Sequence, residues 1–156
     1  MKKESIGNMW RILTAATLLS MICGFDAAMA DDISVNGNPG SLIISSATAG
    51  SDLAPATDAT TTYNIDITIG TKKITGALDT AMPANTSLKA TLAAPTGATS
   101  TGQVTLSVTA FDLVTGIGIG TSQNGLGISY EFSASVLAGI VSAASKTVTF
   151  TISDNL

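Results

Sequence analysis

The chain has 156 residues, 45% of them hydrophobic, with seven Lys and Arg against eleven Asp and Glu and no histidine. The missing histidine removes the commonest general base, the usual metal ligand and every Ser-His-Asp triad. A sparse, acidic charge of −4 argues against nucleic acid and anionic membranes as partners, because both are recognised by clustered Lys and Arg.

Residues 1–30 have the pattern of an export signal. Basic residues precede an uncharged run, 12–25, and Ala28 and Ala30 place small side chains at the two positions that a signal peptidase requires. We predict cleavage between Ala30 and Asp31. The alternative is a retained membrane anchor, but the run of 14 residues is shorter than the roughly 20 that a spanning helix needs.

The predicted mature chain, 31–156, is one domain without a membrane span, in the periplasm, on the cell surface or in the medium. Cys23 and Trp10, the only residues of their types, leave with the signal, so no disulfide is expected. Four lysines against nine carboxylates then give the mature chain a net charge of −5.

Near the start of the mature chain, Ile33 and Val35 alternate with polar residues in a short strand. Residues 36–40 contain Asn, Gly and Pro, which predict a turn. Residues 42–44 predict a brief apolar strand. Residues 45–62 are mainly Ala, Ser, Thr and Asp, and we expect a surface loop or irregular edge there.

Two segments in the middle of the chain, one at 63–69 and one around Leu88 to Leu92, alternate with a period of two, the mark of a half-buried strand. The first, 63–69, points Tyr63 and three isoleucines inward. After a tight turn at 70–72, we expect 73–78 to pair back on it as a hairpin. The alternation resumes with Leu88, Ala90 and Leu92.

The clearest alternation in the chain is 102–110, where Val104, Leu106, Val108 and Ala110 share one face. Beyond it, Asn124-Gly125 predicts a chain reversal.

The last part of the chain begins with an inward row over 128–134. Residues 136–144 are ambiguous and predict a compact connection or one short turn. In the final strand, 147–152, Val148, Phe150 and Ile152 point inward.

Seven or eight short strands, with turns between them, predict an all-β fold: a single immunoglobulin-like antiparallel β-sandwich.

The glycine-rich run 116–120 does not match a dinucleotide or phosphate loop, and a strand edge or bulge explains it better. Asp66 and Asp79 could form a carboxylate pair, but nothing else suggests a sugar cleft. We expect no catalytic residue, cofactor or metal site, although weak Ca²⁺ binding in a loop stays open.

The signal ending at Ala30, the strands rich in Thr, Ala and Gly, and the C-terminal TVTFTIS together resemble small secreted bacterial surface sandwiches of the pilin-like kind. The chain departs from the commonest fimbrial pattern because it lacks a cysteine pair. The resemblance implies a non-enzymatic subunit that polymerises or adheres by strand addition, with 32–35 as donor through Ile33 and Val35 and with an acceptor edge beside the C-terminal strand.

Two other functions remain open. The first is a monomeric periplasmic or secreted binding module with a ligand at the glycine-rich region 116–125. The second is an enzyme, although the absence of the usual catalytic residue types argues against this hypothesis.

Overall fold

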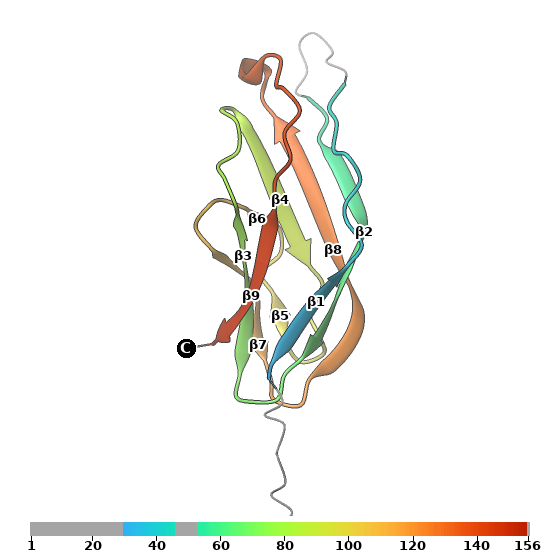
Figure 1. Ribbon diagram of the computed structural model, residues 1–156, viewed down its shortest axis with the longest axis vertical. Helices are drawn as coiled ribbons and strands as arrows, with labels where there is room; N and C mark the ends of the chain where they lie inside the picture. Colours follow the sequence, from blue (N-terminus) through green and yellow to red (C-terminus); the bar gives the residue numbers. More distant parts are fainter. Residues whose placement is uncertain (1–29, 46–52, 156) are drawn as a thin grey trace, which may run out of the picture.

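The computed structural model describes residues 30–45 and 53–155, which form two antiparallel sheets packed face to face (Figure 1). The predicted signal segment falls outside these residues, apart from Ala30. One sheet has five strands, in the order β1 (Asp32–Asn36), β2 (Ala56–Asp66), β8 (Ser122–Ala134), β4 (Thr86–Leu92) and β6 (Val104–Thr105). The other has four, in the order β5 (Thr99–Ser100), β7 (Phe111–Ile117), β3 (Lys72–Leu78) and β9 (Val148–Asp154). The predicted all-β sandwich is confirmed.

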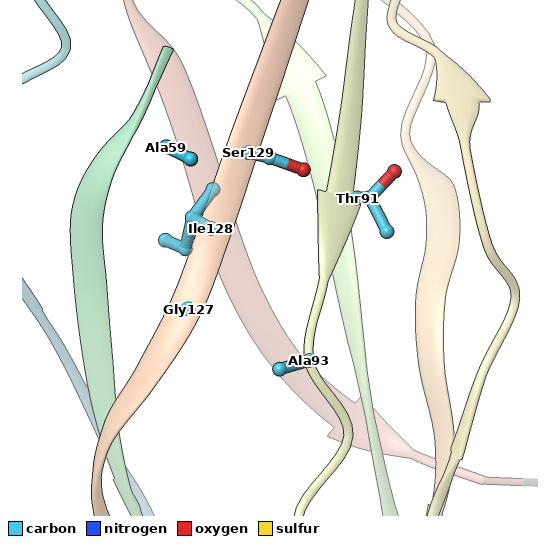
Figure 2. Close-up of a pocket in the computed structure, with 6 residues that line it drawn as sticks. All are labelled: Ala59, Thr91, Ala93, Gly127, Ile128 and Ser129. Carbon is cyan, nitrogen blue, oxygen red and sulfur yellow. The ribbon is translucent and has the colours of Figure 1, made fainter.

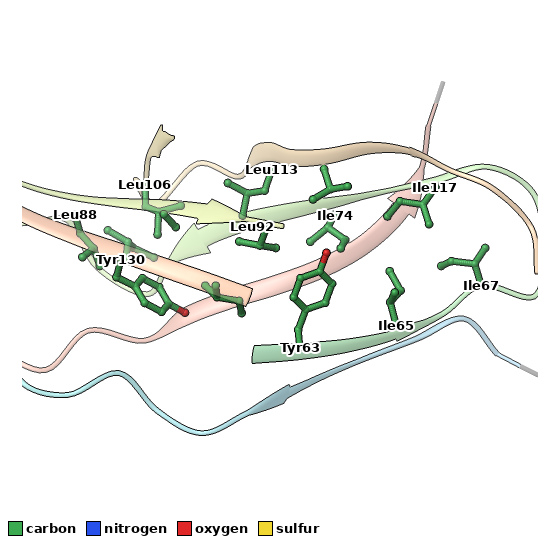
Figure 3. Packing of buried hydrophobic residues seen from close by; sticks show 14 residues of the cluster. Tyr63, Ile65, Ile67, Ile74, Leu88, Leu92, Leu106, Leu113, Ile117 and Tyr130 are labelled. Carbon is green, nitrogen blue, oxygen red and sulfur yellow. The ribbon is translucent and has the colours of Figure 1, made fainter. Parts of the chain in front are cut away.

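The core lies between the sheets and is built mainly from alternate residues of the strands, because successive side chains of a strand point to opposite faces. The exception is in β7, where Leu113 and Val114 are both buried and the register with β3 shifts. Tyr63 and Tyr130 reach into it among aliphatic side chains (Figure 3). The Tyr63 hydroxyl donates to the carbonyl of Ala93 at 2.5 Å, so this buried phenol is satisfied. The buried hydrophobic residues are Tyr63, Ile65, Ile67, Ile74, Leu78, Leu88, Ala90, Leu92, Leu106, Leu113, Val114, Ile117, Ile128 and Tyr130.

The predicted hairpin between 63–69 and 73–78 is wrong. β2 pairs with β1 and β8, whereas β3 pairs with β7 and β9 in the opposite sheet. Beyond the end of β2, Ile67 is bonded to the chain after β7: its N–H donates to Thr121 and its carbonyl accepts from Gly120. The turn at Gly70 therefore carries the chain from one sheet to the other.

The long strand predicted over 102–110 is also shorter than expected. Only Val104–Thr105 form a strand, and Val108 is 57% exposed. The N–H of Leu106 still donates to Leu88 of β4, but Ser107 already accepts from Leu78 of β3. The chain crosses between the sheets at this point, so the inward alternation stops after Leu106.

The turn predicted at Asn124-Gly125 is not a reversal, because β8 runs through it. Gly125 has a positive φ of 71° and its N–H donates to the side chain of Asn64, where the β2–β8 register shifts. Asn-Gly here makes a β-bulge, since glycine tolerates a backbone conformation that other residues avoid. The reversal lies earlier, where the N–H of Thr121 donates to Gly118.

Of three smaller expectations, two are wrong and one agrees with the structure. The first part of β2, from Ala56, pairs with β8 where a loop or irregular edge was predicted, and 42–44 is not a strand. The one short turn allowed for over 136–144 is present as a 3₁₀ turn, η1 (Val136–Ala138), capped by the Ser135 side chain. Among the described residues, no helix is long and apolar enough to cross a membrane.

Candidate interaction edges

The two long sides of the sandwich differ. On one side, the chain between β6 and β7 bonds to both sheets, which closes that side. On the other side, β1 and β9 are the outermost strands of their sheets and lie next to each other (Figure 1). Edge strands present unpaired N–H and C=O groups that another strand can bond. The candidate site of this molecule is therefore the side formed by β1 and β9.

β1 is attached mainly through its backbone. Its five residues pair antiparallel with 62–66 of β2. Of the two predicted strand-donor residues, Ile33 packs partly buried against the core, whereas Val35 is 43% exposed. The structure thus places both donor residues in an edge strand that is paired within its own chain and adds one side chain to the core.

Asp31 fixes the start of β1. Its carboxylate accepts from the peptide N–H groups of Thr68, at 2.8 Å, and Ile69, and lies 3.1 Å from the Lys72 ammonium. These bonds, that of Thr68 above all, lower the pKa of the Asp31 carboxyl to about 2. Lys72 also lies 2.6 Å from Asp154, and both carboxylates raise its pKa. One ammonium therefore links the beginning of β1 to the end of β9.

β9 bonds to β3 on one edge only, and no strand among the described residues pairs with its other edge. At the two ends of this ladder, the N–H of Asp79 donates to Thr147 and the N–H of Asn155 donates to Thr71. Bonded and non-bonded pairs alternate along an antiparallel ladder. The odd-numbered residues of β9 consequently bond to β3, and the even-numbered residues turn their N–H and C=O groups toward the free edge.

The same alternation sorts the side chains of β9. The predicted inward row of Val148, Phe150 and Ile152 is confirmed: these side chains pack partly buried against the core. Thr149 and Thr151 are exposed on the outer face. The core is thus covered only in part along this strand, at the place where the backbone is also unpaired.

The glycine-rich run 116–120 forms the end of β7 and the turn that leads to β8. The β3–β7 register shifts between Lys72 and Ile74, opposite Gly116, which agrees with the expected bulge. Gly116 and Gly120 have positive φ, and Ile119 is exposed at the tip. Two shallow hollows lie elsewhere. One is on the outer face of the five-stranded sheet, and its lining residues, all small except Ile128, are Ala59, Thr91, Ala93, Gly127, Ile128 and Ser129 (Figure 2). The other, at the start of β4 and the end of β8, includes Asn85 and Ser135.

The structure does not bring Asp66 and Asp79 together. Asp66 ends β2 opposite Asp32 and Ser122, whereas Asp79 follows the far end of β3. The Asp79 carboxylate accepts from the N–H of Thr147, which lowers its pKa. Within 30–45 and 53–155, no group of three or more acidic, Cys or His residues could hold a metal ion.

Sequence reasoning missed Lys72, which it assigned only to a turn. Its ion pairs join residues 41 and 82 positions away, and no local pattern signals them. Comparison of the chain with protein-family models, curated proteins and solved structures finds no significant match.

Proposed function

We propose that this chain is an exported, non-enzymatic structural or adhesive surface protein, comparable to a fimbrial subunit, whose copies assemble by exchanging β1. The observation that carries the proposal is the light attachment of β1. Its backbone pairs with β2, but only Ile33 packs against the core.

Exchange conserves the contacts of β1. If β1 leaves, the edge of β2 over 62–66 is exposed beside β9, and the β1 of a neighbouring copy can form the same backbone bonds and bury the same isoleucine. The Asp31–Lys72 ion pair forms equally well between copies. The acceptor edge beside the C-terminal strand, expected from the sequence, is in this proposal the edge that β1 leaves free.

The test is size-exclusion chromatography with light scattering on residues 31–156 and on the same chain without 31–38. We expect large or heterogeneous assemblies that collapse on the deletion. Because exchange conserves the contacts of β1, Val35→Asp should weaken the closed monomer and the assembly alike, so the deletion is the decisive variant. Val108→Asp, which places a charge at an exposed valine outside β1, is the control and should leave assembly unchanged.

Assemblies that persist without 31–38 would contradict strand exchange, and so would a stable monomer in both chains. That result would favour the second candidate, a monomeric binding module with its ligand at 116–125. Export itself is tested separately: N-terminal sequencing of the protein from culture fractions should find Asp31 as the first residue.

A further inference from the structure

The sequence around β9 is nearly the same read in either direction. Residues 146–154 read KTVTFTISD, with Phe150 at the centre. Counting outward from Phe150, Thr149 matches Thr151, Val148 matches Ile152, and Thr147 matches Ser153. At the ends, Lys146 matches Asp154, which carries the opposite charge.

We infer that the free edge of β9 pairs antiparallel with β9 of a second copy of this chain, across a twofold axis at Phe150. The inference goes beyond strand exchange, because it uses an edge that β1 does not occupy. In this register each Phe150 faces the other, and each Val148 faces Ile152 of the second copy.

The backbone fits this register. The even-numbered residues of β9 turn their N–H and C=O groups outward, so Phe150 with Phe150 and Val148 with Ile152 become bonded pairs. The pairs between them, Thr149 with Thr151, are the non-bonded pairs, in which Cα atoms approach to about 4.5 Å.

The side chains fit it as well. On the inner face, Val148, Phe150 and Ile152 are only partly buried in one copy, and the same row of the second copy would cover their open flank. On the outer face, threonine stands opposite threonine, a favourable cross-strand pair. Both faces of the strand are therefore complementary to themselves.

The charges select this register over its neighbours. Antiparallel pairing about Phe150 places Lys146 opposite Asp154, but a shift by two residues in either direction places each charge opposite an apolar residue or beyond the strand. Asp154 remains accessible, with its side chain 70% exposed. In the single copy the Lys146 ammonium donates to Thr80 and Ala81, which follow β3, so it has to turn toward the free edge to reach Asp154 of the second copy.

The topology makes this contact a closed dimer. Two four-stranded sheets join into one of eight strands, whose outer strands are then the two copies of β5, each two residues long. A twofold contact uses the same surface on both copies and so cannot propagate. β9 pairing alone therefore stops at two copies.

Charge reversal on the exposed threonines tests the inference without touching the core. In the double variant Thr149→Lys/Thr151→Lys, each introduced lysine faces a lysine of the second copy. In Thr149→Lys/Thr151→Glu, each lysine faces a glutamate. In chains without residues 31–38, where β1 exchange cannot occur, we expect by light scattering a dimer for the parent, a dissociation constant raised about tenfold or more for the Lys/Lys variant, and a dimer again for Lys/Glu.

The matched control is Thr105→Lys/Thr109→Lys, two exposed threonines away from the β1–β9 side, which should dimerise like the parent. A parent that is monomeric at millimolar concentration, or a Lys/Lys variant that dimerises as well as the parent, would overturn the inference. Circular dichroism confirms that each variant is folded.

Cysteine cross-linking tests the register, because the mature chain has no cysteine of its own. An oxidised mixture of Thr149→Cys and Thr151→Cys chains should form mostly mixed disulfides, since these positions face each other and their expected Cα separation suits a disulfide. Cross-links mainly between identical chains would refute the register.

The deletion of 31–38 separates this contact from strand exchange. We expect the β9 dimer to survive the deletion, whereas assemblies built by β1 exchange are lost. A dimer that disappears with the deletion but persists in the Lys/Lys variant would overturn β9 pairing and leave β1 exchange standing.

Discussion

A methyl group added at Gly76 should destabilise the protein through a single contact. Gly76 lies in the middle of β3, between Phe111 of β7 and Phe150 of β9. A Cβ atom there would lie 2.6 Å from Cδ1 of Leu113, about 1 Å closer than carbon atoms ordinarily approach. Leu113 is fully buried, so its side chain cannot move away into solvent.

The magnitude follows from opposing effects. Replacing Gly76 by alanine restricts the unfolded chain, which favours folding by about 0.4–1 kcal/mol, and buries one methyl group, worth about 0.8 kcal/mol. Forcing an extra carbon into a filled core costs about 1–3 kcal/mol. Because the contact is this short, we expect a cost near the upper limit and a net loss of about 1 kcal/mol for Gly76→Ala. Gly76→Val, with two further carbons at the same place, should lose more.

Urea unfolding, followed by the fluorescence of Tyr63 and Tyr130, measures these changes in residues 31–156, which contain no tryptophan. The decisive comparison repeats Gly76→Ala in a Leu113→Ala background, where the colliding atom is gone. There the substitution should stabilise by about 1 kcal/mol, so that its effect reverses sign. An equal effect in both backgrounds would refute the steric explanation, as would a Gly76→Ala protein more stable than its parent.

Two more predictions concern polar groups. The Thr61 hydroxyl is buried without a hydrogen-bond partner, so Thr61→Val, which keeps the shape of the side chain, should raise the free energy of unfolding by about 1 kcal/mol. The control is Thr105→Val, at an exposed threonine. A loss of stability in Thr61→Val would mean that the hydroxyl is satisfied. Asp31→Asn should lower the urea midpoint at pH 7, and much less at pH 2. The folded pKa of Asp31 is about 2, below its ordinary 3.8, so the ionised carboxylate stabilises the fold fully above pH 4, and this contribution declines below pH 4 and is lost as the pH falls through 2. A deficit independent of pH would contradict that role.

The inward rows could be predicted from the sequence because a half-buried strand has a period of two. Leu88, Ala90 and Leu92 are buried as expected, and so, in part, are Val148, Phe150 and Ile152. The first half of β2 could not be predicted in this way. It carries few large apolar residues, and its place in the sheet depends on pairing with β8, more than sixty residues further along the chain.

The local sequence could not predict which of the two sheets a strand joins. The turn at Gly70 has the same composition whether β3 folds back on β2 or crosses to the other sheet. What decides between them is distant: Gly120 and Thr121 occupy the backbone of Ile67, and β7 and β9 flank β3. In the same way, Asn124-Gly125 provides the backbone conformation of a turn, and the partner strand makes it a bulge.

The candidate site, too, depends partly on a local sequence pattern and partly on the order of strands in the sheet. The near-symmetry of 146–154 about Phe150 is visible in the sequence, but it has consequences only because β9 lies at the edge of its sheet, which the order of the strands determines. A twofold contact through β9 alone ends at a dimer, and exchange of β1 alone links copies through one kind of contact. Because the two contacts use different strands, a molecule that makes both would join dimers to one another, and such a chain can grow without limit. The proposed surface assembly and the proposed dimer are therefore compatible. Variants confined to β1 should leave dimers, whereas variants confined to β9 should leave the products of strand exchange.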